Sequence, residues 1–324
     1  MSKRLGARRG LVAAAVLAVA AVAALAVVGV AGANRSASCG TINLNEQAWA
    51  GSTANTYVAK NVLESIGCKV NITQIAEIPV YQAMADGKVD AVLEDWQHTA
   101  QYKQYITQQH TAVMGGPNGV IGHIGWYIPS YLMKQYPQFK TWQGLKGKET
   151  IFKSPESGSQ GMFLGGDPSY VQKDQQLIQL LGLNFKFVSV GAEPAQVARW
   201  TQLYKQHKPV IFYWYTPQYL NTEYQLSEVK LPPRFNGCQD NVAPGVPLKA
   251  YKCAYENEVL NKIFSAKFAK SGSPAYAVLK RWAWTNLDQE NVARLIAGQH
   301  MDPDKAAKQW IAANQAKVNK WLGK

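Results

Sequence analysis

The chain has 324 residues, of which 47% are hydrophobic and 17% charged, enough to build two globular lobes. Its net charge is +13, but the lysines and arginines are scattered and form no dense run, zinc-ligand spacing or recognition helix. The composition therefore argues against a nucleic-acid partner. On an exported protein, such a surface is suited to facing anionic lipid or wall polymer.

The first 33 residues have the pattern of an export signal, and they hold four of the basic residues and no acidic ones. An uncharged Ala/Val/Leu run over 11–30 follows, and Ala31–Ala33 offers a small-residue cleavage site. The run is also long enough to cross a bilayer, so an uncleaved anchor stays open. Small residues before Cys39 leave lipidation open as a third alternative. We expect an extracytoplasmic protein, secreted or held at the outer face of the cell membrane.

After this segment, short apolar runs alternate with stretches of helical periodicity, which predicts an α/β fold. The predicted strands are Thr41–Asn45, Lys69–Ile75, Ala91–Leu93, Ile121–Ile128, Thr150–Phe152, Phe185–Val190 and Pro209–Trp214. The predicted helices are Ala54–Ile66, Val80–Asp86, Gln172–Leu181, Pro194–Gln206, Ala275–Trp284, Asp288–Ala297 and Pro303–Trp321. The apolar face of the last helix places Trp310 and Trp321 in the core.

An even number of cysteines in an exported chain suggests disulfides, here among Cys39, Cys68, Cys238 and Cys253. Cys39 and Cys68 precede the first two predicted strands, which a helix connects. Such strands are parallel neighbours, so their starts lie about 5 Å apart, within disulfide reach. The other two cysteines would close a Pro/Gly-rich loop. A disulfide at Cys39 would exclude its lipidation.

Two Gly/Pro-rich stretches, Met114–Gly119 and Leu231–Phe235, predict crossings between lobes. A chain that leaves one lobe, builds a second and returns would place lobe 1 over residues 40–118 plus 232–324. Lobe 2 would then span residues 119–231.

Four of the ten tryptophans share a context, since each follows a strand-like run and precedes a turn: Trp49, Trp96, Trp126 and Trp214. Taken singly, each is more often a core residue than a site residue. Ligands of α/β sheets bind at the carboxyl ends of strands, so together these indoles predict an aromatic cage. Such cages recognise quaternary ammonium groups through the ring quadrupole.

Gly51 and Ser52 follow the first of these tryptophans and open a predicted helix. A helix N-terminus presents free N–H groups that attract a carboxylate, although ordinary capping explains the same residues. A cage beside an anion-binding turn would suit a zwitterion with a methylated ammonium at one end.

Glu94, Asp95 and His98 suggest a rival interpretation, a secreted enzyme with acid–base or metal chemistry. The chain has no His-Glu-x-x-His pattern, no Gly-x-Ser-x-Gly elbow and no P-loop. We therefore expect no metal, no cofactor and no catalysis.

From about Gly40 onward, the chain resembles the glycine betaine/choline/proline-type substrate-binding proteins of ABC importers. The segments that carry the resemblance are Trp49–Thr53, Gly87–Trp96, Gly125–Pro129, Phe152–Gly158, Pro209–Pro217 and Trp284–Asp288. The resemblance implies a two-lobed, type II periplasmic-binding-protein fold with the ligand in the inter-lobe cleft. It also implies a small quaternary-ammonium ligand, an ABC transporter permease as membrane partner, and a monomer.

By the same resemblance, Trp49 and Trp96 would form the box from the first lobe, and Trp214 with Trp126 or neighbouring Tyr127 from the second. Choline-selective relatives tend to carry an acid where this chain has Gly51. This favours a carboxylate-bearing ligand, glycine betaine, with choline, carnitine or proline as alternatives.

Overall fold

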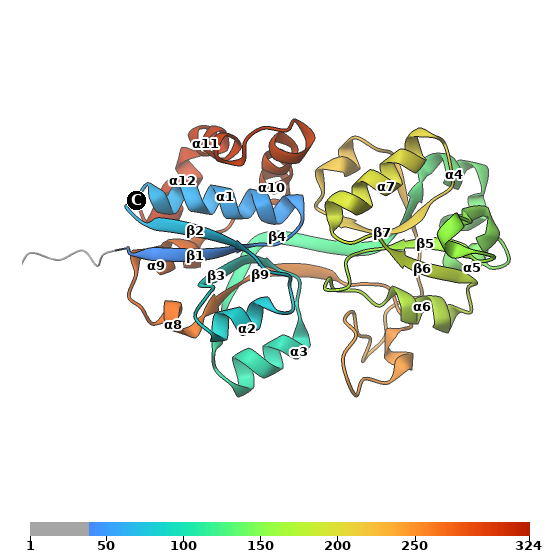
Figure 1. The fold of residues 1–324 in the computed structure, drawn as a ribbon, viewed down its shortest axis with the longest axis horizontal. Helices are drawn as coiled ribbons and strands as arrows, with labels where there is room; N and C mark the ends of the chain where they lie inside the picture. Colours follow the sequence, from blue (N-terminus) through green and yellow to red (C-terminus); the bar gives the residue numbers. More distant parts are fainter. Residues whose placement is uncertain (1–38) are drawn as a thin grey trace, which may run out of the picture. The chain divides into compact units, whose positions relative to one another are not determined.

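The computed structural model describes residues 39–324, so the predicted export segment lies outside the described residues. In this part of the chain, nine strands form one mixed sheet in the order β2-β1-β3-β9-β4-β7-β5-β6, with β8 paired to β4 (Figure 1). The strands are β1 (Thr41–Glu46), β2 (Lys69–Gln74), β3 (Ala91–Asp95), β4 (Ala112–Pro129), β5 (Gly161–Gly165), β6 (Phe185–Ser189), β7 (Ile211–Thr216), β8 (Leu226–Val229) and β9 (Asn257–Ser265).

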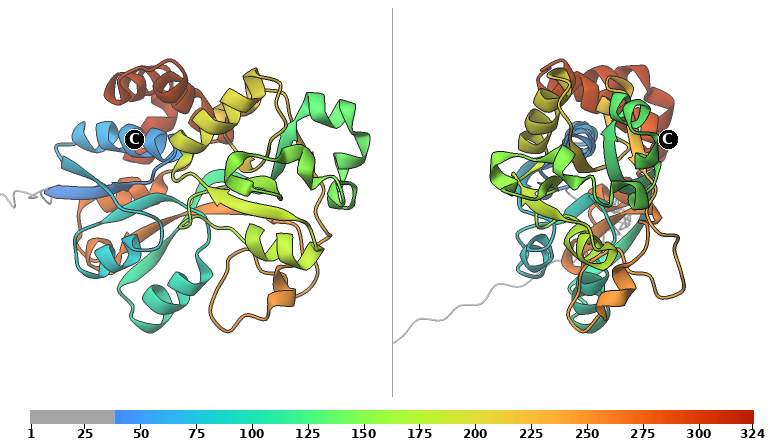
Figure 2. Two further views of the ribbon diagram at one scale, coloured as in Figure 1. Left: turned by 45° about the vertical axis from the view of Figure 1, so that its right-hand side comes forward. Right: turned by 90° about the vertical axis from the view of Figure 1, so that its right-hand side faces the viewer.

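Helices flank the sheet on both sides (Figures 1 and 2). The α-helices are α1 (Ala50–Glu64), α2 (Val80–Ala85), α3 (Thr99–Gln101), α4 (Ser130–Gln135), α5 (Trp142–Leu145), α6 (Asp174–Leu181), α7 (Glu193–Lys205), α8 (Ala266–Ala269), α9 (Pro274–Arg281), α10 (Asn286–Ala293), α11 (Pro303–Ala313) and α12 (Gln315–Leu322). Within residues 39–324, none of the helices combines the length and apolar character needed to cross a membrane.

The sheet has two parallel halves, one built from β1, β2 and β3 and the other from β5, β6 and β7. The antiparallel strands β4 and β9 run between them (Figure 1). Strand β4 pairs with β9 along much of its length and with β7 near its end, and its register shifts between Pro117 and Ile121. The two-lobed α/β prediction is confirmed, and the predicted crossing Met114–Gly119 lies inside β4.

Most predicted elements are present, but the predicted strand Thr150–Phe152 is wrong. These residues form a 3₁₀ turn, Glu149–Phe152. The Phe152 ring is buried against Phe139 and Phe185, so its apolar run reflects core packing and not strand pairing. The structure adds strands β5, β8 and β9, which the sequence pattern did not reveal.

The predicted C-terminal helix is divided in two at Asn314, between α11 and α12. The Asn314 side chain donates to the Trp310 carbonyl at 2.8 Å and competes with the helical ladder at that point. The predicted core positions of Trp310 and Trp321 are confirmed, since both are buried and stack at 5.8 Å.

Both predicted disulfides are present. Cys39 and Cys68 have Cα atoms 4.8 Å apart and flank the paired starts of β1 and β2, where Thr41 lies opposite Lys69. The sulfur of Cys39 is therefore not available to carry a lipid in this structure. The second disulfide closes a loop between β8 and β9, with a sequence separation of 15 residues.

That loop is anchored to the start of α6 (Figure 2). The buried ammonium of Lys173 donates to Asp240 at 2.7 Å and to the Gln239 carbonyl at 2.9 Å, and Tyr255 donates to Asp174 at 2.8 Å. Because these contacts are with the β5–β7 half, we infer that the chain returns to the first lobe in β9. The predicted return at Leu231–Phe235 comes earlier in the chain.

Candidate ligand-binding site

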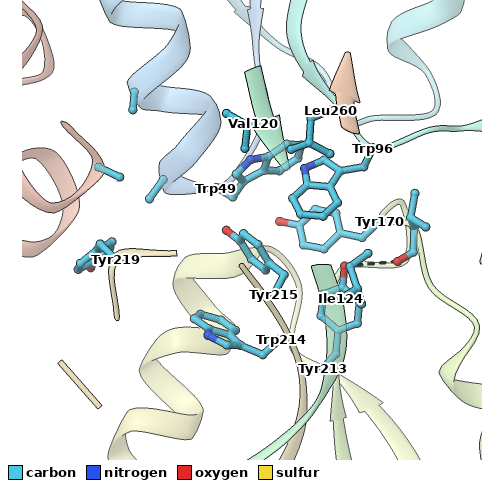
Figure 3. Close-up of a cluster of buried hydrophobic side chains, with 14 of the residues drawn as sticks. Trp49, Trp96, Val120, Ile124, Tyr170, Tyr213, Trp214, Tyr215, Tyr219 and Leu260 are labelled. Atoms are coloured by element: carbon cyan, nitrogen blue, oxygen red, sulfur yellow. Dashed lines mark hydrogen bonds between the residues drawn. The ribbon is translucent and has the colours of Figure 1, made fainter. Parts of the chain in front are cut away.

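An aromatic cavity of about 260 Å³, part of it open to solvent, is lined from both halves of the sheet (Figure 3). Its lining residues are Trp49, Glu77, Trp96, Tyr170, Val171, Tyr213 and Tyr215. Trp49 lies between β1 and α1, and Trp96 directly follows β3. Tyr170 follows β5, and the remaining two tyrosines lie on β7. The cavity thus forms at carboxyl ends of parallel strands, as expected for an α/β sheet.

One buried carboxylate orients both indoles. Glu94 Oε1 accepts the Nε1–H of Trp49 at 2.9 Å and that of Trp96 at 3.1 Å. Its Oε2 accepts from the Asn55 amide at 2.8 Å. Burial raises the pKa of Glu94 to about 7, while the hydrogen bonds from the two indoles oppose that shift by stabilising the charged form. Glu94 therefore fixes the angle at which the two rings face the cavity.

The opposite wall consists of tyrosines that meet the indoles edge to face. Trp49 and Tyr170 have ring centroids 5.5 Å apart at 88°, and Trp96 and Tyr215 have theirs 5.5 Å apart at 84°. Perpendicular pairs are a favoured aromatic geometry, and here they leave space between the four rings. Each pair joins one half of the sheet to the other.

A second buried carboxylate, Glu193 at the start of α7, holds this wall. It accepts hydrogen bonds from the Tyr215 hydroxyl, from the Gln218 amide at 3.2 Å and from the Ala50 backbone N–H at 3.0 Å. The Tyr170 hydroxyl donates to the Ala48 carbonyl at 3.1 Å. Both contacts to the β1–α1 turn cross between the two halves.

The structure brings Trp49 and Trp96 together as predicted but does not bring Trp214 to the cavity. Successive residues of a strand face opposite sides of a sheet, so on β7 Tyr213 and Tyr215 face the cavity and Trp214 faces away. Trp214 packs on Trp200, with ring centroids 5.2 Å apart.

Trp126 and Tyr127 do not line the cavity either. Trp126 is fully buried against Phe163, with its indole N–H donating to Asp174 at 2.6 Å. Tyr127 is buried in the same hydrophobic core. Both lie on the part of β4 that pairs with β7 and β8. Their rings therefore pack in the core of the β5–β7 half. The rings that line the cavity from the β5–β7 half are tyrosines.

Gly51 and Ser52 lie inside the first turn of α1, which begins at Ala50 and not at Ala54. Both are buried, and the Ser52 hydroxyl accepts the Gln47 backbone N–H at 2.8 Å. The helix N-terminus does receive a carboxylate, but it is that of Glu193 on Ala50. Neither Gly51 nor Ser52 lines the aromatic cavity.

The cluster of the rival interpretation is engaged in structural contacts. Asp95 accepts from the hydroxyls of Tyr81 and Tyr102 and from the Gln97 backbone at 3.0 Å. His98 is buried, with Nε2 3.3 Å from the Ser169 carbonyl. Among residues 39–324, no group of three or more His, Cys, Asp or Glu side chains is arranged to hold a metal ion.

Among the residues of this candidate site that sequence reasoning missed are Glu77, Tyr170, Tyr215 and Glu193. For Tyr215, the available signal was the alternation of side chains along β7. Successive residues of a strand point to opposite faces of the sheet, so Trp214 and Tyr215 cannot both face the cavity. Nothing in the local sequence marks the other three, since each reaches the site from a turn or a helix start.

Comparisons with known proteins agree with this architecture. Residues 40–313 match the family model for the substrate-binding domain of ABC-type glycine betaine transport systems. A trimethylamine N-oxide-binding protein of Pelagibacter ubique is 25% identical over 284 residues, covering 83% of this chain and 86% of that protein.

Solved structures share the fold. A glycine betaine/L-proline-binding protein from Borrelia burgdorferi matches with a TM-score of 0.69 and 20% identity, over 87% of this chain and 96% of that one. A choline-binding protein in complex with choline matches with a TM-score of 0.69 and 17% identity, over 88% and 92%. Lactococcal OpuAC in its closed, glycine betaine-bound conformation gives 0.64 and 22%, over 87% and 99%. The chain therefore has the two-lobed periplasmic-binding-protein fold and belongs to the family of substrate-binding domains of ABC-type glycine betaine transport systems.

Proposed function

We propose that this protein captures a small quaternary-ammonium or related methylated-amine solute and delivers it to a membrane permease. Its family consists of extracytoplasmic substrate-binding proteins of ABC transporters for betaine- and choline-type solutes. The observation that carries the proposal is the cavity between two perpendicular indole–tyrosine pairs, Trp49 with Tyr170 and Trp96 with Tyr215. A desolvated cation on such rings gains about 2 kcal/mol per contact.

Glycine betaine remains the ligand we expect, because its trimethylammonium group is the kind of cation that aromatic rings bind. Carnitine is larger than glycine betaine, and proline has no methylated ammonium group to occupy an aromatic box. The relative that binds trimethylamine N-oxide adds that compound to the ligands worth testing, together with choline.

The distribution of the rings couples binding to the arrangement of the lobes. The indoles come from the β1–β3 half and the tyrosines from the β5–β7 half, so a ligand contacts all four only when the halves are close. A ligand that binds one arrangement better shifts the population toward it. A permease that distinguishes the closed form would thereby recognise the loaded protein.

The enzyme alternative has no observation in its favour. The oxygens of Glu94 are occupied by Trp49, Trp96 and Asn55, which leaves this carboxylate as a support for the aromatic rings.

Intrinsic tryptophan fluorescence against glycine betaine, trimethylamine N-oxide, choline, carnitine and proline, followed by calorimetry, tests the proposal. We expect saturable binding of a methylated ammonium and its loss in Trp49→Ala. Trp142→Ala, a partly buried tryptophan of α5 outside the cavity, is the matched control and should bind normally. Absence of binding by the whole panel, or equal affinity in Trp49→Ala, would contradict it.

A further inference from the structure

We propose that Glu77 forms the polar end of this site. As a carboxylic acid, it donates a hydrogen bond to a formally negative oxygen of the bound solute, either a carboxylate or an N-oxide. This inference rests on the proposed function, because it presumes that a methylated ammonium occupies the aromatic rings. It replaces the α1 N-terminus, which the sequence suggested, as the place where the ligand oxygen is received.

Glu77 lies in the turn before α2 and lines the aromatic cavity, with only 4% of its surface exposed. Its Oε1 has no hydrogen-bond partner within residues 39–324. Its Oε2 is 3.7 Å from His98 Nε2, which is longer than a hydrogen bond. A buried polar atom without a partner destabilises a protein by about 1–3 kcal/mol, so a ligand oxygen at this position would relieve an existing cost.

Glu77 is also the donor that the protein leaves unused in this cavity. The two indole N–H groups donate to Glu94. The hydroxyl of Tyr170 donates to the Ala48 carbonyl, that of Tyr215 to Glu193 and that of Tyr213 to the Val171 carbonyl.

No lysine, arginine or histidine is among the lining residues. The α1 N-terminus is not free either, because Ala50 N–H donates to Glu193 at 3.0 Å. Among the side chains that line the cavity, the Glu77 carboxyl is therefore the polar group left to meet a ligand oxygen.

The surroundings keep the Glu77 carboxyl protonated near neutral pH. Burial is the main cause that raises its pKa to about 8; the charge of His98 opposes the shift, and those of Asp95, Glu94 and Asp167 reinforce it. Glu258 on β9 is buried nearby and interacts with the same group.

His98 does not cancel this effect, because its charge is already balanced. Burial lowers the pKa of His98, but the carboxyls of Glu77 and Asp95 more than offset this and bring it to about 9. Burial raises the pKa of Asp95, but the nearby His98 and the hydroxyls of Tyr102 and Tyr81, which donate to Asp95, lower it below its usual value. His98 Nδ1 and Asp95 Oδ1 lie 3.7 Å apart, so Asp95 offsets the imidazolium charge, and burial with the nearby carboxylates still raises the pKa of Glu77.

The sign of the pH dependence follows from this protonation state. A neutral Glu77 donates to a ligand oxygen, and an ionised one repels it. Affinity for glycine betaine or trimethylamine N-oxide should therefore be constant below the pKa and fall above it. With a pKa of about 8, the fall between pH 7 and pH 9.5 amounts to about 30-fold. A carboxylate acting as counter-ion would give the reverse, an affinity that rises with pH.

Calorimetric titration from pH 6 to 9.5 of the wild type, Glu77→Gln and Glu77→Leu against glycine betaine, trimethylamine N-oxide and tetramethylammonium tests the proposal. The amide introduced by Glu77→Gln retains a donor, so this variant should bind within about 3-fold of the wild type at pH 7 and lose most of the pH dependence. Glu77→Leu should lose at least about 10-fold. The oxygen-bearing solute that shows this pattern identifies the acceptor as carboxylate or N-oxide, and tetramethylammonium should not lose affinity at high pH.

An affinity that rises with pH for both oxygen-bearing solutes would overturn the inference, as would unchanged binding in Glu77→Leu. A loss of more than about 10-fold in Glu77→Gln at pH 7, with the protein folded, would also overturn it. Failure of the proposed function looks different, since the wild type would then bind no member of the panel at any pH. If Trp49→Ala abolishes binding while Glu77→Leu does not, the result supports the aromatic site and contradicts only the role of Glu77.

Discussion

Two clusters of tryptophans in this protein use the same side chain in opposite ways. In the cavity, Trp49 and Trp96 share one carboxylate oxygen of Glu94 and meet tyrosine edges at nearly right angles, which leaves space between the rings. In the C-terminal cluster, Trp321 stacks on Trp282 at 4.1 Å and lies nearly parallel to Trp310. There the rings fill the volume themselves.

The difference lies in what holds the rings. A buried charge that accepts two indole N–H groups fixes their angle from behind and leaves their faces free for a cation. In the C-terminal cluster, Trp321 donates to the Ala283 carbonyl at 3.0 Å, and Trp282 and Trp284 have no partner for their N–H groups within the described chain. Stacking on neighbouring rings covers the ring faces in this cluster. Trp49 and Trp96 differ from these rings in that one shared carboxylate orients them beside a cavity.

Trp321→Ala should give the largest effect and should act on stability alone. Removing a fully packed indole costs about 3–5 kcal/mol of unfolding free energy, because it leaves a cavity among its stacked neighbours. Urea denaturation should show this loss, while the folded fraction binds its solute with unchanged affinity. A loss of affinity in folded Trp321→Ala would show that the two clusters are coupled.

Trp96→Ala should show the converse. It removes one aromatic ring that would contact the cation and the edge contact with Tyr215, for a loss of about 2–3 kcal/mol in binding, or roughly 30- to 150-fold in Kd. Calorimetry measures the loss, and Trp321→Ala is its matched control. Equal affinities in the wild type and Trp96→Ala would place the ligand outside this cavity.

Glu94→Gln should produce the smallest effect and tests whether the carboxylate orients the rings. The amide oxygen of the introduced Gln still accepts the indole N–H groups. Its NH₂ group cannot accept from the Asn55 amide, so the hydrogen bond from Asn55 is lost. We expect about a 10-fold weaker affinity at pH 8. Glu149→Gln is the control, because Glu149 is also buried but accepts from the Asn184 backbone, outside the cavity. Similar affinities in both variants would mean that packing alone sets the ring angle.

Much of the fold could be predicted from local sequence patterns. Strand starts next to Cys39 and Cys68 predicted their disulfide, because sequential parallel strands place such positions side by side. The turns after β1 and β3 placed Trp49 and Trp96 at strand ends, where the structure has them. Strand β9 was missed, because its polar and apolar residues come in pairs and do not alternate, so its pattern is weak beside that of the buried parallel strands.

The sequence by itself determined the family, the two-lobed fold and both disulfides, and it placed Trp49 and Trp96 after the strands where the structure has them. These depend on periodicity, spacing and short segments, which are local properties. Only the tertiary structure decided which rings line the cavity from the second lobe, because the choice between Trp214 and Tyr215 depends on which side of β7 faces the first lobe. It alone also placed Glu77 beside the rings and Glu193 on the α1 N-terminus, since these carboxyls come from segments far from the tryptophans in sequence. Burial and partner availability, which give Glu77 its unused donor, exist only once both halves of the sheet are assembled.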